Sequence, residues 1–78
     1  MQVEVRLFAN LAQFLPPGAR GRTTLEVPAG TTVDEVVRRL AIPDDLPRLT
    51  LVNGQDPAPG HRLGPGDVVS LLPPLAGG

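Results

Sequence analysis

The sequence predicts one α+β domain, in which a mixed sheet of about four strands packs against a single main helix. Three observations support this prediction. Residues 1–8 alternate apolar and polar side chains, residues 31–40 carry apolar side chains at helical spacing, and residues 49–52 and 68–72 are short apolar runs bounded by turn signals. A chain of 78 residues forms one compact domain and leaves no room for a second.

The first third of the chain predicts two strands separated by a short helix and a loop. Residues 1–8 are expected to be the first strand, with their apolar members on the buried face. Asn10 is placed to cap a short helix that ends before Pro16. Residues 18–22 form a basic loop. Residues 23–27 are rich in β-forming residues, so we expect a second strand that pairs with the first.

The main helix has the clearest local signals. It begins at Thr31 or Thr32, and Thr32 with Glu35 fits the capping box, in which each side chain accepts a hydrogen bond from the backbone of the other residue. Pro43 is expected to stop the helix. The apolar stripe expected to face the sheet consists of Val33, Val36, Val37 and Leu40.

The second half of the chain predicts two more strands, over residues 49–52 and 68–72. Asn53-Gly54 is a strong tight-turn signal after the first of them, and residues 64–67 form a turn before the second. Residues 55–62 are expected to be a loop. The first and last strands of the chain are the most apolar, which is typical of central strands.

Composition excludes several kinds of chemistry. The chain has no cysteine, so disulfides, thiolate metal sites and thiol catalysis are excluded. Its seven basic residues are all arginines, which excludes Schiff-base lysines and a P-loop lysine. A formal charge of -1 and only two aromatic residues argue against a nucleic-acid partner. The sequence shows no transmembrane or signal pattern, so we expect a cytoplasmic protein that does not bind membranes.

The titratable side chains have ordinary explanations. His61 is the only histidine, so a histidine-based metal site or a catalytic triad is not expected, and a solvated loop position explains it. The acidic pairs at residues 34–35 and 44–45 fit helix-cap and turn roles. Arg20 and Arg22 either meet an acidic partner or lie solvated in a loop, and the second alternative is the simpler one. We therefore expect no metal site and no catalytic side chain.

The C-terminus carries the strongest functional signal. We expect residues 1–72 to form the folded domain and residues 73–78 an extended tail, because the two prolines that begin this tail cannot continue a sheet. Such a tail reaches about 20 Å. Gly77 and Gly78 have no side chains, so they fit a slot too narrow for other residues. The tail is shaped to deliver its terminal carboxylate into another protein's active site; the alternative is a frayed chain end.

An exposed apolar face is the second functional signal. Phe8 is expected on the opposite face of the sheet from the buried residues of the first strand, and residues 68–72 are apolar on both faces. One helix covers only one face, so the other is expected to bind a partner. The alternative is that loop 55–62 folds over this face. The expected partner-binding residues are Phe8, Leu71, Pro73, Pro74, Leu75 and Ala76.

Five segments of the chain carry a family resemblance. They are Val-x-Val-x-Leu-Phe-Ala in the first strand, Thr-Val-Asp-Glu-Val-Val in the helix, Leu-Val-Asn-Gly, Leu-x-x-Gly-Asp-x-Val and the final Pro-Pro-Leu-Ala-Gly-Gly. With them the chain resembles the ubiquitin-like sulfur carriers of the MoaD/ThiS family over essentially its whole length. The resemblance implies a β-grasp fold, with a mixed four- to five-stranded sheet on one main helix. The Pro-Pro-x-x-Gly-Gly ending is most similar to the small subunit of molybdopterin synthase (MoaD).

The resemblance also implies a function, that of a carrier protein and not of an enzyme. A ubiquitin-activating-like adenylyltransferase (MoeB/ThiF type) adenylates the carboxylate of Gly78 with ATP, and sulfur from a donor such as a cysteine desulfurase then replaces AMP to give a thiocarboxylate. In the molybdopterin branch, the tail with Gly77 and Gly78 enters the large synthase subunit (MoaE type). ATP is the partner's substrate, so no bound cofactor is expected. The alternatives are a thiamine-type or other sulfur pathway, a protein modifier conjugated through Gly78, and a plain interaction module.

Overall fold

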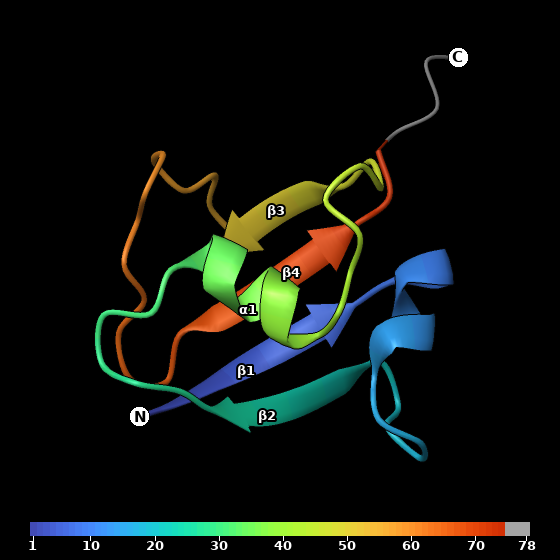
Figure 1. Ribbon diagram of the computed structural model, residues 1–78, viewed down its shortest axis with the longest axis horizontal. Helices are drawn as coiled ribbons and strands as arrows, with labels where there is room; N and C mark the ends of the chain where they lie inside the picture. Colours follow the sequence, from blue (N-terminus) through green and yellow to red (C-terminus); the bar gives the residue numbers. More distant parts are fainter. Residues whose placement is uncertain (75–78) are drawn as a thin grey trace.

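Residues 1–74 form a four-stranded mixed sheet with one α-helix across one face, as predicted (Figure 1). The computed structural model describes residues 1–74. The elements in chain order are strand β1 (Gln2–Leu7), the 3-10 helix η1 (Ala9–Phe14), strand β2 (Arg22–Glu26), helix α1 (Val33–Arg39), strand β3 (Leu49–Val52) and strand β4 (Val68–Leu72). The first and last strands, β1 and β4, are central, which confirms the prediction from their apolar composition.

The parallel pairing of β1 with β4 lies at the centre of the sheet. β2 pairs antiparallel with β1, and β3 pairs antiparallel with β4, which gives the order β2-β1-β4-β3. The register sets Val5 beside Val69 and Leu7 beside Leu71. Because side chains alternate between the two faces of a strand, these four buried side chains share the face that α1 covers.

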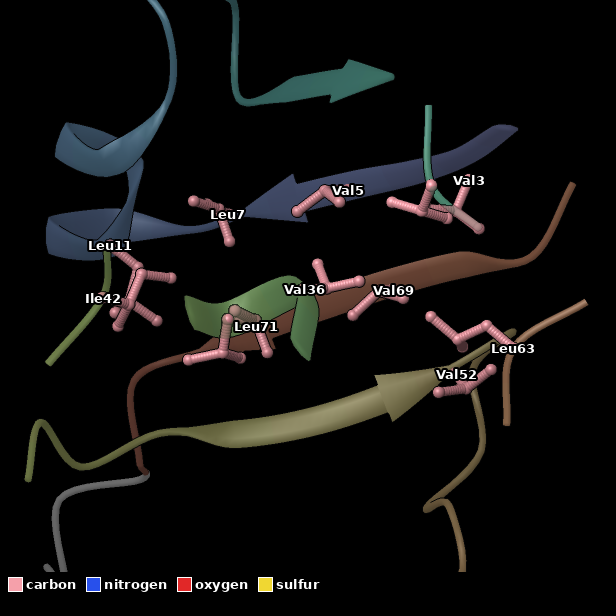
Figure 2. Packing of buried hydrophobic residues seen from close by; sticks show 12 residues of the cluster. Val3, Val5, Leu7, Leu11, Val36, Ile42, Val52, Leu63, Val69 and Leu71 are labelled. Atoms are coloured by element: carbon pink, nitrogen blue, oxygen red, sulfur yellow. The ribbon is translucent and has the colours of Figure 1, made fainter. Parts of the chain in front are cut away.

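The hydrophobic core fills the layer between the sheet and α1 (Figure 2). Leu11 and Ile42 lie at one end of this layer, and Val52 and Leu63 lie at the other. The buried members are Val3, Val5, Leu7, Leu11, Val27, Val36, Val37, Ile42, Val52, Leu63, Val69 and Leu71. Of the predicted helical stripe, Val36 and Val37 are fully buried, whereas Val33 and Leu40 are partly buried against the core.

The start of α1 confirms the predicted capping box. The backbone N–H of Glu35 donates to Oγ1 of Thr32 at 3.3 Å, and the backbone N–H of Thr32 donates to Oε1 of Glu35 at 3.4 Å. Both N–H groups lack a partner within the helix, so these bonds fix the residue at which the chain becomes helical.

The end of α1 differs from the prediction, because the helix ends at Arg39 and not at Pro43. Ala41 adopts a left-handed conformation with φ 60°, and the N–H of Ile42 donates to the carbonyl of Val37 at 3.2 Å. This is a Schellman motif, which reverses the chain after a helix and brings a following apolar residue back onto it. Ile42 and Val37 are both buried, so the helix ends where Ile42 turns back into the core, and Pro43 is not what stops it.

The turn after β1 is a 3-10 helix, and the prediction that Asn10 caps it is wrong. Phe8 is the N-cap residue, in an extended conformation, and no side chain donates or accepts a capping hydrogen bond. The chain bends at Ala9, which has a φ of 53°. This bend carries Leu11 into the core, where it is 0% exposed, so burial of one leucine determines the position of η1.

A hydrogen-bond network around Asp67 joins the end of β3 to the start of β4. Asp67 accepts the Gly64 N–H at 2.8 Å through Oδ2 and Nδ2 of Asn53 at 3.0 Å through Oδ1. Asn53 in turn accepts the N–H of Val68 at 2.9 Å. The two bonds that Asp67 accepts, first that from Gly64 and then that from Asn53, hold the pKa of the Asp67 carboxyl below its ordinary value. Positive φ angles at Asn53 and Gly54 confirm the predicted tight turn.

Leu71→Ala and Leu72→Ala are neighbouring truncations with different expected costs. Leu71 is 0% exposed in the core, whereas Leu72 points to the other face and is half-buried. We expect Leu71→Ala to lower the free energy of unfolding by about 2–5 kcal/mol, because it leaves a cavity. Leu72→Ala should cost clearly less. Urea unfolding followed by circular dichroism measures both values, and equal costs would contradict the assignment of the two faces.

The Asp67 network predicts a loss of stability in acid. The pKa of Asp67 is lower in the folded chain than in the unfolded chain, so the unfolded chain takes up the proton first as the pH falls. The stabilisation is complete above the unfolded pKa, near pH 4, and is lost as the pH falls through the folded pKa. Asp67→Asn should lower stability at pH 6 and weaken the acid dependence between pH 5 and pH 3.

Urea titrations at a series of pH values measure this effect. Asp44→Asn is the matched control, because Asp44 lies exposed in a turn. An acid dependence that is the same in the wild type and in Asp67→Asn would show that this network does not link stability to pH.

Candidate functional site

The face of the sheet opposite α1, hereafter the outer face, carries no helix or strand within residues 1–74 (Figure 1). Its cross-strand pairs include Leu49 with Leu72 and Leu51 with Ser70. The part over β1 and β2 is charged and includes Glu4 and arginine side chains, whereas the part over β4 and β3 is mostly apolar. The outer face is therefore divided into an apolar half and a charged half.

Four apolar residues form a patch toward the edge at which β4 leaves the sheet. Phe8 is 44% exposed and Leu49 is 47% exposed. The N–H of Phe8 donates to the carbonyl of Leu71 at 3.1 Å, so Phe8 takes the position beside Leu72 on the neighbouring strand. Exposed apolar side chains that gather in this way mark a binding surface. This apolar patch consists of Phe8, Leu49, Leu51 and Leu72.

The structure corrects one predicted partner-binding residue. Leu71 is 0% exposed and points into the core, so it does not belong to the outer face. Leu72 occupies that face instead, and Leu49 and Leu51 are further members that sequence reasoning missed. Ser70 carried the missing signal, because the polar residue of β4 marks the outer face and its neighbours two positions away share that face.

The tail begins directly beside this patch. Pro73, which follows Leu72 at the end of β4, is half-buried, and Pro74 is exposed. Leu75 and Ala76, which were predicted to contact a partner, and Gly77-Gly78, the predicted reactive end, lie outside the described residues.

Loop 55–62 does not cover the outer face, so that alternative is wrong. Arg62 pairs with Thr32 in an isolated β-bridge next to the start of α1. The N–H of Leu63 donates to the carbonyl of Thr31 at 2.8 Å, and the Leu63 side chain is buried in the core. Because Thr31 and Thr32 immediately precede α1, these contacts hold the loop on the helical side of the sheet and leave the apolar patch open.

The loop and the start of α1 border a hollow of about 330 Å³. Asp34, Asp56 and His61 line it, and all three side chains are exposed. This is an open depression at the surface rather than an enclosed cavity that excludes water. Among residues 1–74, no group of three or more histidine, aspartate or glutamate residues is placed to hold a metal ion. No helix in the same part of the chain has the length and apolar character needed to span a bilayer.

A small mixed sheet with one helix across one face and an open apolar patch on the other is the architecture of ubiquitin-like proteins. Comparison with known families gives the particular family. The chain matches the ThiS family over residues 5–78 and therefore belongs to it. It is a ubiquitin-like protein of the sulfur carrier or modifier type (ThiS/MoaD). No significant match was found among curated protein sequences.

Solved structures show the same fold. The chain is 26% identical to SAMP1 from Haloferax volcanii, with a TM-score of 0.77 and complete coverage of both chains. A second structure of this small archaeal modifier protein 1 gives a TM-score of 0.75 at 26% identity, with 95% of this chain and 98% of that chain covered. A chain in the complex of subunits 1 and 2 of molybdopterin-converting factor from Helicobacter pylori is 23% identical, with a TM-score of 0.64 and complete coverage of both chains. The fold is thus the predicted β-grasp, with a four-stranded sheet.

The exposure of the apolar patch predicts that its side chains contribute little to folding. Phe8→Thr and Leu49→Thr keep β-forming side chains, so each should change the free energy of unfolding by less than about 1 kcal/mol. Val69→Thr is the buried control, because it places a hydroxyl in the core, where Val69 is 0% exposed. Thermal and urea unfolding measure all three variants. A cost for Phe8→Thr as large as that for Val69→Thr would show that Phe8 serves the fold.

Proposed function

We propose that this chain is a sulfur carrier whose Gly78 carboxylate is adenylated, converted to a thiocarboxylate, and used to donate sulfur in molybdopterin synthesis, with the chain as the small subunit of the synthase. The observation that carries the proposal is the position of the apolar patch. β4 runs into Pro73 beside Phe8 and Leu72, so a partner that binds the patch is also placed to receive the tail. Membership of the ThiS family supports the carrier role.

The chemistry follows from the composition of the chain. There is no cysteine, so no side chain holds a transferable sulfur atom, and a C-terminal carboxylate is the group that remains. A carboxylate resists nucleophilic attack until one oxygen becomes part of a leaving group. Attack of the Gly78 carboxylate on the α-phosphate of ATP releases pyrophosphate and gives an acyl adenylate. Sulfide then attacks the carbonyl carbon, the bond to AMP breaks, and the thiocarboxylate remains. If the nucleophile is the persulfide of a donor protein, an acyl disulfide forms first, and a thiol cleaves its S–S bond to release the thiocarboxylate and leave a disulfide on the donor.

Two observations favour the molybdopterin branch. The Pro-Pro-Leu-Ala-Gly-Gly ending resembles that of the small synthase subunit, and the fold is shared with a chain of the Helicobacter pylori molybdopterin-converting factor complex. In this proposal, the apolar patch binds first the adenylyltransferase and then the large synthase subunit. A cysteine desulfurase or a similar donor supplies the sulfur.

A modifier role is the second candidate, and the likeness to small archaeal modifier protein 1 favours it. The activated Gly78 would then form an amide bond with a lysine of a target protein. The chain itself has no lysine, so it cannot be extended into chains through its own side chains. Both candidates share the adenylation step and differ in the nucleophile that follows.

Removal of Gly78 tests the shared step. With the adenylyltransferase of the same organism and radiolabelled pyrophosphate, the wild-type chain should support ATP–pyrophosphate exchange, and the chain lacking Gly78 should lose it by at least about 100-fold, because the reacting carboxylate is then displaced by one residue. Leu72→Ala should keep most of the maximal exchange rate. Because this change weakens binding of the partner to the apolar patch, a higher concentration of the carrier should be needed to reach that rate.

Gly64→Ala is the matched control for loss of a glycine, since Gly64 precedes the start of β4, its backbone is not left-handed, and an added Cβ would make only ordinary contacts there. It should support exchange at the wild-type rate. Exchange that continues undiminished without Gly78 would contradict the carrier and the modifier functions alike.

A further inference from the structure

Three arginines gather beside the apolar patch, over β1 and the start of β2. The register places Arg6 of β1 directly opposite Arg22 of β2 on the outer face. Arg20 precedes β2 by two residues. Together with Phe8, these side chains border a hollow of about 410 Å³. The hollow thus combines the three arginine side chains with the exposed aromatic ring of Phe8, which belongs to the apolar patch.

The backbone fixes this arrangement. The N–H of Leu7 donates to the carbonyl of Gly21 at 3.0 Å, which holds the loop against the end of β1. Gly21 has a φ of +79°, a conformation that other residues rarely adopt. Because Gly21 is held beside Leu7, its neighbours Arg20 and Arg22 lie next to Phe8 at the rim of the hollow. Both side chains are exposed, as the simpler sequence interpretation expected.

The charges of this hollow are not balanced within the described chain. Like charges directly opposite on paired strands destabilise a sheet, and Arg6 and Arg22 form such a pair. Glu4 forms an ion pair with Arg6. Within residues 1–74, neither Arg20 nor Arg22 has a carboxylate within ion-pair distance. A chain with a formal charge of -1 therefore concentrates positive charge at one place, and folding gives no reason for it.

We infer that this hollow is a docking site for carboxylate side chains of a partner protein, whose adjoining apolar surface covers Phe8. Arginine is suited to this role because its guanidinium group binds a carboxylate through two parallel hydrogen bonds. The acidic pI of about 5.6 and the absence of further aromatic residues disfavour a nucleic acid as the occupant. The inference rests on the proposed function, which supplies the partner.

The adenylyltransferase is the partner to which we assign this site. Every pathway left open for the carrier, and the modifier role as well, requires that enzyme, whereas the large synthase subunit serves only one of them. The site would act mainly on the rate of association, because opposite charges on two surfaces attract before contact is made. The apolar patch would then supply the contacts that hold the complex together.

Charge reversal tests the inference. The association rate constant of the full-length chain with the adenylyltransferase of the same organism is measured by stopped-flow fluorescence, at roughly 20 mM and roughly 500 mM salt. Arg20→Glu/Arg22→Glu should lower this constant at least about 10-fold at low salt, and the difference from the wild type should shrink at high salt. The association rate constant of Arg20→Gln/Arg22→Gln at low salt should lie between that of the wild type and that of Arg20→Glu/Arg22→Glu.

Arg38→Glu/Arg39→Glu is the matched control, because it makes the same change in net charge at exposed positions of α1, on the other face of the sheet. Circular dichroism confirms that each variant is folded. The control should associate within about threefold of the wild type.

The outcomes separate this inference from the proposed function. If the wild-type chain is adenylated and the Arg20→Glu/Arg22→Glu variant associates as fast as the wild type, or no more slowly than the helix control, the docking site is refuted and the carrier function stands. If the wild-type chain neither associates nor is adenylated, the proposed function is refuted and the docking site with it. A salt-dependent loss confined to the Arg20 and Arg22 variants supports both.

Discussion

The parallel pairing of β1 with β4 is the constraint on which the rest of the structure depends. It places the first and last strands of the domain side by side, so both strands end at the same edge of the sheet. Phe8 and the beginning of the tail consequently leave the sheet together. The register of this pair also determines which side chains of β4 face the core and which lie on the outer face. A shift of β4 by one residue would turn Leu72 into the core and expose Leu71.

The same pairing explains how a domain of this size retains a binding surface. A chain this short buries only about 60% of the surface that it exposes when unfolded, so its large apolar side chains are needed for the core. Leaving Phe8 and Leu49 exposed is therefore costly unless a partner covers them. The arginines beside Phe8 extend this surface from β3 across to β2, a span of about 15 Å at the usual spacing of strands. An apolar patch and a basic hollow thus lie next to the start of the tail.

Much of the fold followed from local patterns in the sequence. The capping box of Thr32 and Glu35 and the turn at Asn53-Gly54 were predicted because each depends on residues close together in the chain. The central position of the two most apolar strands was predicted from the composition of each strand. The errors arose where tertiary burial decided the outcome. Burial of Ile42 ended α1 early, and burial of Leu11 positioned η1 without a cap. Leu71 rather than Leu72 was wrongly predicted to bind a partner, because β4 is apolar except for Ser70 and its apolar and polar residues therefore alternate little.

The central claim is that the C-terminal carboxylate of this chain carries sulfur. Intact-protein mass spectrometry of the chain, purified from its own organism without reductant, tests the claim most directly. The account predicts a fraction heavier by the replacement of one oxygen atom by sulfur, with the change located at Gly78 by fragmentation. A single unmodified mass, unchanged after incubation with ATP, sulfide and the adenylyltransferase, would contradict the account.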